Sequence, residues 1–314
     1  MQISLMIEGQ NGLNWPRWQR IVTAAEELGF YGLYRSDHYT NAEPPDLDSL
    51  ELWISLTWLA SHTRRIKFGP LVSPVSFRHP TMTARMASAV DDLSGGRLVL
   101  GLGAGWQERE HHNYGWELLG IDDRFARFAE GLEVISLLLY SDIPVDYSGR
   151  FYHLDNAILL PRPQRRGRPP ILIGGDGEKR TLPLVARLAD EWNAVYITAD
   201  EFARLNARLD ELLEVEGREK GEVRRSLMTG CVFGRDQAEV NRKVAERTKN
   251  KRDAAQLRSH GVIVGAGADI REQLAELVEV GVEQVMLQWL DLDDLAGIEA
   301  LAEQIFRRGI TNVP

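Results

Sequence analysis

The sequence predicts a single α/β domain folded as a closed (β/α)8 TIM barrel, and three observations support this prediction. Short apolar runs of strand type alternate eight times with longer amphipathic stretches of helical period. The length of 314 residues exceeds the about 250 that such a barrel needs and leaves about 60 for insertions. No linker composition, repeat or low-complexity tract divides the chain, so residues 1–314 are interpreted as one domain. A doubly wound open sheet is the alternative fold.

Each expected strand is a short, mostly apolar run bounded by turn residues. The eight runs are residues 3–7, 32–36, 66–72, 98–102, 171–174, 194–197, 227–233 and 284–288. The stretches between and after them repeat apolar side chains every three or four positions, as one face of a helix requires. They predict helices at residues 15–28, 48–62, 80–93, 124–140, 181–191, 200–216, 237–258, 270–280 and 292–306.

Residues 142–170 are expected to form an insertion. The turn Tyr147-Ser-Gly149 and the extended run Phe151-Tyr-His-Leu154 predict a β-hairpin. Four prolines that follow predict a stiff link, and we expect both pieces to lie over the top of the barrel.

The composition excludes several classes of function. A net charge of −9 argues against a nucleic-acid surface, which needs clustered Lys and Arg. Cys231 is the only cysteine, so an internal disulfide and a Cys-rich metal site are excluded, and no histidine pair has metal-ligand spacing. The start lacks a signal-like segment, and no run approaches about 18 apolar residues. We therefore expect a soluble cytoplasmic protein without nucleic-acid, membrane or metal partners.

The candidate chemistry lies where the predicted strands end, because active sites of such barrels form at the carboxyl ends of the strands. The most informative stretch is residues 98–115, in which an apolar strand runs into Gly103-Ala-Gly105 and then into polar, aromatic and charged residues. Glycines let the backbone approach a ligand closely, and the residues after them supply polar groups that a packed core would exclude. The pattern predicts a cofactor-sized opening at this strand end.

The second strand ends in Arg35-Ser-Asp-His-Tyr39. An imidazole at that place is suited to proton transfer or to a hydrogen bond with a cofactor, because its pKa lies near working pH. The alternative is a solvated loop histidine, which these residues alone favour, since His38 is one of seven histidines.

Glycine and proline interrupt the third strand and follow the fifth. Gly69, Pro70 and Pro74 indicate either a bulge, which could support a flat ring, or simply the end of the strand. After the fifth strand, the glycines between Gly174 and Gly177 precede a helix, and such a turn exposes backbone N–H groups to a phosphate. A tight turn capped by Thr181 is the alternative.

These segments together resemble the bacterial luciferase-like flavin oxidoreductases, and more narrowly their deazaflavin branch, which uses coenzyme F420. The resemblance runs from residue 1 to about residue 306 and rests mainly on residues 93–115, supported by Ser36-Asp-His38, by residues 69–80 and by residues 173–181. It implies the barrel fold, a flavin or deazaflavin at the barrel mouth and a homodimer.

The resemblance also implies roles for individual residues. His38 matches a histidine beside the ring to which proton transfer is assigned, and Glu8, which lines the site from the first strand, joins it in the catalytic set. Leu71 and Val72 fall where many members have a cis peptide that supports the ring. The implied cofactor site comprises Ser36, Asp37, His38, Leu71, Val72, Gly103, Ala104, Gly105, Gly174, Gly175, Asp176, Gly177 and Thr181.

One departure from the family pattern limits the substrate. Sugar-phosphate dehydrogenases of this family have a glutamate directly after the strand-four glycines, where this chain has Trp106, so a glucose 6-phosphate reaction is not expected. Trp106 is interpreted as a wall of the substrate pocket or as packing under the next helix. Glu108 and Glu110 are interpreted as a solvated helical face.

The predicted function is therefore hydride transfer between coenzyme F420 and a small organic substrate. An FMN-dependent monooxygenase of the same fold is the first alternative. A cofactor-binding protein without catalytic activity is the second, and the presence of His38 with the bulge and the strand-four turn argues against it.

Overall fold

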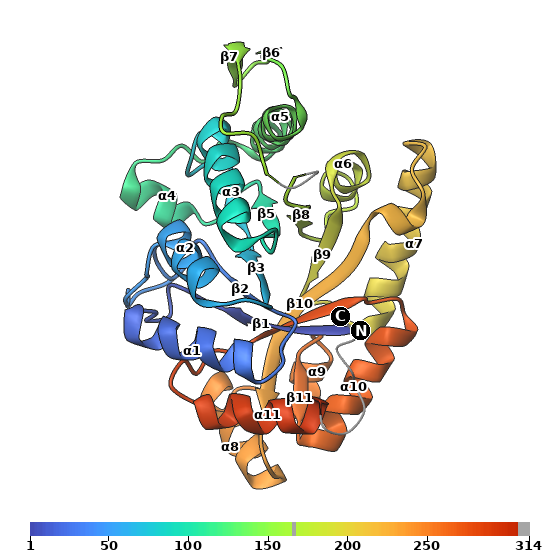
Figure 1. Cartoon of the computed structure of the whole chain (residues 1–314). Helices are drawn as coiled ribbons and strands as arrows, with labels where there is room; N and C mark the ends of the chain where they lie inside the picture. Colours follow the sequence, from blue (N-terminus) through green and yellow to red (C-terminus); the bar gives the residue numbers. More distant parts are fainter. Residues whose placement is uncertain (165–167, 307–314) are drawn as a thin grey trace.

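The protein is a parallel barrel surrounded by helices in the computed structural model, which describes residues 1–164 and 168–306 (Figure 1). Part of the predicted insertion, residues 165–167, lies outside the described residues. The barrel strands are β1 (Gln2–Ile7), β2 (Gly32–Arg35), β3 (Lys67–Pro70) with β4 (Ser73–Pro74), β5 (Leu100–Gly103), β8 (Ile171–Gly174), β9 (Glu191–Val195), β10 (Arg224–Phe233) and β12 (Gln284–Gln288).

The circuit of strands closes between β3 and β5. Parallel pairs connect the strands in the order β3-β2-β1-β12-β10-β9-β8-β5-β4. Of the third strand predicted at 66–72, the structure forms β3, and β4 lies beyond the predicted end; a cis peptide between Leu71 and Val72 stands between the two, as the family resemblance implied. Phe68 of β3 then joins the start of β5: its N–H donates to Arg97 O at 3.2 Å, and its carbonyl accepts from Val99 N at 2.8 Å. The alternative prediction of an open, doubly wound sheet is therefore wrong, and the prediction of a closed barrel is confirmed.

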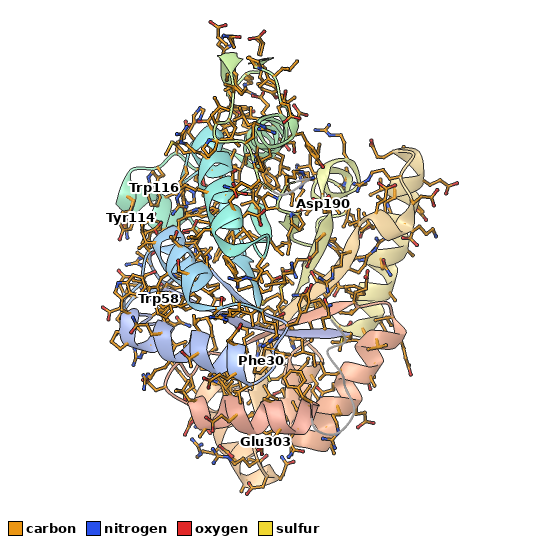
Figure 2. The ribbon with its side chains drawn as sticks, in the orientation of Figure 1. Phe30, Trp58, Tyr114, Trp116, Asp190 and Glu303 are labelled. Atoms are coloured by element: carbon orange, nitrogen blue, oxygen red, sulfur yellow. The ribbon has the colours of Figure 1, made fainter. Side chains whose placement is uncertain are left out.

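Helices cover the outside of the barrel. They are α1 (Trp15–Glu27), α2 (Leu52–His62), α3 (Pro80–Ser94), α4 (Glu108–Tyr114), α5 (Ile121–Tyr140), α6 (Thr181–Leu188), α7 (Ala199–Val215), α8 (Gln237–Thr248), α9 (Ala254–Arg258), α10 (Gly267–Glu279) and α11 (Leu295–Phe306). The first and last of these helices meet at Phe30, which lies beside α1 and α11 (Figure 2). Its ring meets the ring of Phe306 edge-on, with 5.3 Å between the ring centroids. None of the helices within the described ranges combines the length and apolar character needed to cross a bilayer.

Several predicted boundaries were wrong. The helix expected at 237–258 is broken because Lys249 and Asn250 both adopt the left-handed conformation (φ 51° and 59°), after which Asp253 caps a separate helix, α9. The helix expected to run to residue 191 ends at Leu188, because Glu191 already pairs as the first residue of β9. The helix α4 was anticipated only as a helical face at Glu108 and Glu110, without bounds, and the three-residue strand β11 (Ile263–Gly265), which pairs with β10, was not predicted.

The core has two layers, one between the sheet and the helices and one inside the barrel. Successive side chains along each strand point alternately into one layer and the other. On β1, Leu5 and Ile7 belong to the large cluster between the sheet and the helices, whereas Met6 points into the barrel. The barrel interior under the mouth holds an apolar cluster of Met6, Tyr34, Leu71, Val99, Leu172, Met228 and Met286. A ligand at the carboxyl ends of the strands therefore rests on an apolar floor.

The predicted hairpin is confirmed as β6 (Val145–Ser148) paired antiparallel with β7 (His153–Ala157). It packs on the outer side of α5 (Figure 1), where the Glu130 carboxylate accepts N–H bonds from Arg150 and Phe151 at 2.9 and 2.8 Å. The described part of the insertion thus lies on the helical ring and not over the cavity at the barrel mouth.

Candidate active site

A cavity of about 420 Å³ opens at the carboxyl ends of the barrel strands. It brings together nine of the predicted site residues: Glu8, Ser36, His38, Leu71, Val72, Gly105, Trp106, Gly174 and Gly175. Five lining residues were not predicted, namely Met6, Pro74, Asn193, Val195 and Met228. Met6, Val195 and Met228 lie on expected strands, and Asn193 directly precedes one, so the inward-facing positions of the strands were the available signal.

His38 lies at the edge of this cavity and is bound to Glu110. Its Nδ1 is 2.8 Å from Glu110 Oε1, and the second carboxylate oxygen accepts the Tyr39 N–H at 3.0 Å. The side chain of Glu110 is only 1% exposed, whereas that of His38 is 18% exposed. The interpretation of Glu110 as a solvated carboxylate was therefore wrong, and His38 is not a free loop histidine. Glu108 is exposed, as predicted.

The environment of His38 favours the imidazolium. Burial alone would lower the pKa of His38, but the hydrogen bond and negative charge of Glu110, with smaller contributions from Glu8 and Asp37, raise it above the usual value. With Nδ1 committed to Glu110, Nε2 is the nitrogen left to exchange a proton with a ligand.

Replacing Glu110 with glutamine is expected to lower the pKa of His38. The amide keeps a similar shape but removes the negative charge that stabilises the imidazolium. The pKa is measured from the imidazole C–H chemical shift of His38 during an NMR pH titration. Glu108→Gln, which removes an exposed carboxylate from the same short helix, is the matched control and should leave the His38 titration unchanged. An unaltered His38 pKa in the Glu110 variant would contradict the assignment.

The residues around His38 come from a helix that folds back over the end of β2. On α4 and its N-cap, Gln107, Glu110 and His111 are all buried and share one helical face. Gln107 contacts Thr40 at 3.2 Å and His111 Nε2 lies 2.8 Å from Ser76 Oγ. This polar face anchors α4 to the loops after β2 and β4, and so fixes the Glu110 carboxylate beside His38.

Trp106 covers His38 from the solvent side. Its ring meets the imidazole edge-on at 5.5 Å, and it is 61% exposed. Of the two interpretations of Trp106, the geometry favours a wall of the cavity, because the indole is not packed under a helix. Nearby, Tyr114 and Trp116 stack at 5.1 Å on the outer side of the same region (Figure 2).

Ser36 and Asp37 hold the loop after β2 in place. Ser36 Oγ accepts the Gly9 N–H at 2.8 Å and donates to Gln10 at 2.7 Å. The buried Asp37 carboxylate accepts from Ser73 at 2.7 Å and forms an ion pair with Arg78. Asp37 therefore connects β2 to β4 and does not line the cavity, although it was predicted to bind the cofactor.

Glycines at two strand ends make room for Val72 beside the cavity. A Cβ on Gly103 would lie 2.6 Å from a Val72 methyl, and one on Gly174 would lie 3.2 Å from the other. Gly103 and Ala104 were predicted to bind the cofactor, but they do not line the cavity. Gly103 acts indirectly, because it lets the Leu71–Val72 segment form one side of the cavity.

The loop after β8 differs from the predicted phosphate cradle. Gly175 adopts φ 123° and its N–H donates to Asn193 O at 2.9 Å. Asp176 accepts the Val195 N–H at 3.0 Å, which ties the loop to β9, so its carboxylate is committed to the fold. Burial raises the pKa of Asp176 to about 6.

Thr181 also has a different role from either predicted one. It is the first residue of α6, its N–H donates to Gly177 O at 2.8 Å, and the preceding Arg180 occupies the N-cap without a side-chain bond. Thr181 is 5% exposed, and neither it nor Gly177 lines the cavity. Gly174 and Gly175 are the part of this loop that reaches the cavity.

Comparison with known proteins identifies relatives over most of the chain. Residues 1–284 match the profile of the family described as "Luciferase-like monooxygenase". The chain is 32% identical over 203 residues to a 4-hydroxyprotoasukamycin monooxygenase of Streptomyces nodosus, which covers 64% of this chain and 52% of that protein. It is 26% identical over 296 residues to an F420-dependent glucose-6-phosphate dehydrogenase of Kineococcus radiotolerans, covering 92% and 83% of the two chains.

A solved structure shares the fold. An F420-dependent secondary alcohol dehydrogenase, in complex with an F420-acetone adduct, superposes with a TM-score of 0.83 at 18% identity over 97% of this chain and 98% of that one. The match to the Streptomyces monooxygenase spans only about half of that protein, so its whole activity is not implied by the similarity.

Proposed function

Because the chain belongs to the luciferase-like monooxygenase family, we propose that it is an oxidoreductase that uses coenzyme F420 to transfer a hydride to or from a small organic substrate. The observation that carries the proposal is the His38–Glu110 pair at the edge of an apolar cavity. A protein that only binds a cofactor has no need for a histidine whose protonated form is stabilised in this way.

The cavity has features that suit a flat heterocyclic ring. Leu71, Val72 and Val195 offer apolar surface, and the backbone of Gly174 and Gly175 permits close approach. Asn193 supplies a polar contact: it lines the cavity, is fully buried, and its Oδ1 has no hydrogen-bond partner, while its Nδ2 donates to Ser226 at 2.9 Å. An N–H group on the edge of a deazaflavin or flavin ring would satisfy this acceptor.

The residues of the chain position the reactants and move a proton. The deazaflavin ring, when bound, supplies the hydride chemistry. His38 Nε2 holds the proton that balances the hydride at the substrate oxygen or nitrogen, and Glu110 keeps the imidazole oriented and charged. Trp106 limits water at the open side of the cavity and gives the substrate an aromatic surface.

The charge around the β8 loop favours a singly charged phosphate group. Asp176 and Lys179 lie in this loop, whereas Glu178 is paired with Arg204 and Arg180 with Asp122. A phosphodiester, as in the tail of coenzyme F420, meets less repulsion there than the doubly charged phosphate of FMN. This is the reason to prefer F420 on the evidence of the chain itself.

Replacing Asp176 with asparagine is expected to strengthen binding of coenzyme F420 at pH 7 and to reduce the pH dependence of its affinity near pH 6. In the wild type the carboxyl group ionises at about 6, so affinity should fall as pH rises through that value. A phosphodiester does not titrate there, and the difference between the wild-type and Asp176→Asn pH profiles separates the Asp176 carboxyl group from His38, which also titrates in this range. Cofactor fluorescence titrations between pH 5 and 8 measure it, with Asp146→Asn, on the remote hairpin, as the control. A wild-type affinity that is flat across this range would contradict the expectation.

An FMN-dependent monooxygenase is the second candidate, and the 32% identity to a Streptomyces monooxygenase favours it. Side-by-side fluorescence titrations with coenzyme F420 and FMN distinguish the two. Micromolar binding of F420 without FMN supports the proposal, and the reverse supports the monooxygenase. Binding of neither cofactor would contradict both and favour a protein without this chemistry. The homodimer and the cytoplasmic location stay predictions.

A further inference from the structure

A second cavity, of about 530 Å³, lies beside the barrel mouth between α8, α9 and the end of β9. Its lining includes Arg247, Lys251, Arg252 and His260, and none of its lining residues is acidic. This is unusual in a chain with a net charge of −9. A cavity with cationic groups and no acid on its walls is suited to an anionic ligand group.

Arg247 is the fixed element of this cavity. Its Nη2 donates to Tyr196 Oη at 3.1 Å and lies 3.4 Å from Gln288 Oε1, so two neutral side chains hold the guanidinium. Within the described part of the chain, no carboxylate forms an ion pair with it. A half-buried guanidinium that is held only by neutral groups keeps its full charge for a ligand.

The backbone at Tyr196 and Gly230 makes room for the Arg247 guanidinium. Tyr196 adopts the left-handed conformation at φ 55°, which a tyrosine rarely does. A Cβ on Gly230 would lie 2.6 Å from Arg247 Nη2 and 3.0 Å from Tyr196 Oη, so the glycine makes room for both groups. Strain of this kind is tolerated mainly where a side chain has to be held for function.

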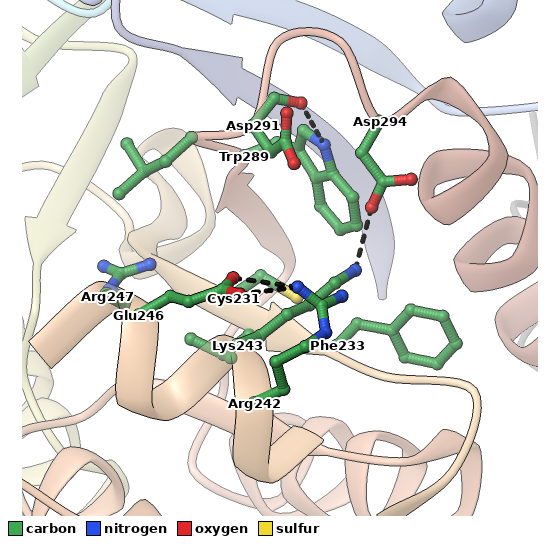
Figure 3. Close-up of a pocket in the computed structure, with 11 residues that line it drawn as sticks. Cys231, Phe233, Arg242, Lys243, Glu246, Arg247, Trp289, Asp291 and Asp294 are labelled. Atoms are coloured by element: carbon green, nitrogen blue, oxygen red, sulfur yellow. Dashed lines mark hydrogen bonds and ion pairs between the residues drawn. The ribbon is translucent and has the colours of Figure 1, made fainter. Parts of the chain in front are cut away.

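The neighbouring cavity of about 320 Å³ provides a contrast (Figure 3). There, Arg242 is paired with Glu246 at 2.8 Å, and Lys243 with Asp294 at 2.8 Å. Figure 3 draws both pairs as dashed lines, and Arg247 points away from them without such a line. Arg247 lines both cavities, and of the three cations around the smaller one only Arg242 and Lys243 are neutralised by carboxylates of the protein.

The Arg247 cavity is also connected to the candidate active site. Gln288, which contacts Arg247, hydrogen bonds to Tyr196 and donates to Glu8 Oε1 at 2.6 Å, and Glu8 lines the barrel-mouth cavity. One chain of side chains therefore joins the two cavities. A molecule whose reactive part lies in the barrel mouth could place a charged end at Arg247.

We propose that Arg247, with Lys251, Arg252 and His260, forms a binding site for an oxyanion, a phosphate or carboxylate group of a ligand that occupies the barrel mouth. The link to that ligand rests on the proposed function, but the anion site itself does not. The two sources of such a group are the organic substrate and the phosphate-bearing tail of the cofactor.

The first test measures binding of inorganic phosphate to the purified protein without cofactor, by isothermal titration calorimetry at constant low ionic strength. We expect Arg247→Gln to weaken phosphate binding at least tenfold. Arg242→Gln is the matched control, because it removes the same charge from the same helix but from a paired, exposed side chain, and it should change nothing. The double variant Lys251→Gln/Arg252→Gln, at two exposed positions, repeats the test without touching Tyr196 or Gln288 and should weaken binding at least threefold.

Equal phosphate affinity in the wild type, the Arg247 variant and the double variant would overturn the site. Titration of coenzyme F420 with and without phosphate then identifies the source of the anion. Independent binding of the two assigns the oxyanion to the substrate, and mutual exclusion assigns it to the cofactor tail. If the protein binds phosphate through Arg247 but binds neither F420 nor FMN, the anion site stands and the proposed function fails.

Discussion

Replacing His38 with alanine is expected to reduce turnover by about 100-fold or more, the usual contribution of a positioned general acid or base. The loss follows from the geometry, because Glu110 occupies Nδ1 and leaves Nε2 as the proton-exchanging atom at the edge of the cavity. The Kd of the cofactor should change by less than about tenfold, or about 1.4 kcal/mol, since apolar and backbone contacts form most of the cavity.

Steady-state kinetics and cofactor titration on the same preparation separate these two effects. His112→Ala is the matched control, because His112 is an exposed histidine on α4 that does not line the cavity, and its turnover should equal that of the wild type. Wild-type turnover in His38→Ala would remove His38 from the proposed role. A large loss of cofactor affinity with little change in kcat would instead make it a binding residue.

The sequence predicts His38 but not its partner, and the reason is geometric. His38 is the third residue after the end of β2, so its place near a strand end can be inferred from the local pattern. Glu110 lies on a helix of seven residues, too short for a periodic signal, and meets His38 only because α4 folds back over the loop after β2. A signal was present, since Gln107, Glu110 and His111 have the spacing of one helical face. Nothing local indicated that this face is buried.

The barrel was predictable because buried parallel strands leave a strong apolar pattern, and the errors occur where local pattern is ambiguous. Lys249 and Asn250 break a helix without a glycine or proline to indicate it. In the loop after β8, Gly174 and Gly175 were among the predicted cofactor-binding residues and do line the cavity, whereas Gly177 does not. Asp176 instead accepts a hydrogen bond from the Val195 N–H. This contact could not be predicted, because Val195 belongs to a neighbouring strand whose position the residues of the loop do not specify.

Gly69 lies where the barrel closes, and the absence of a side chain there affects both the fold and the cavity. The sequence predicted a bulge or a strand end here, and the structure gives a further reason for the glycine. A Cβ on Gly69 would lie 1.9 Å from Val99 O, and one on Gly101 would lie 2.1 Å from Pro70 O. Two glycines thus allow the backbones of β3 and β5 to approach where the barrel closes, directly before the Leu71–Val72 segment that lines the cavity.

Replacing Gly69 with alanine is therefore expected to lower the free energy of unfolding by about 3 kcal/mol or more, because the added methyl group meets rigid backbone and the strands must separate to admit it. Urea unfolding followed by circular dichroism measures the loss. Gly221→Ala is the control, since a Cβ there meets nothing within 4 Å, and its stability should stay close to that of the wild type. The folded fraction of the Gly69 variant should also bind its cofactor more weakly, because a shift of β3 moves Leu71 and Val72 with it. Wild-type stability together with wild-type affinity would mean that the close approach of β3 and β5 is not what holds this side of the cavity.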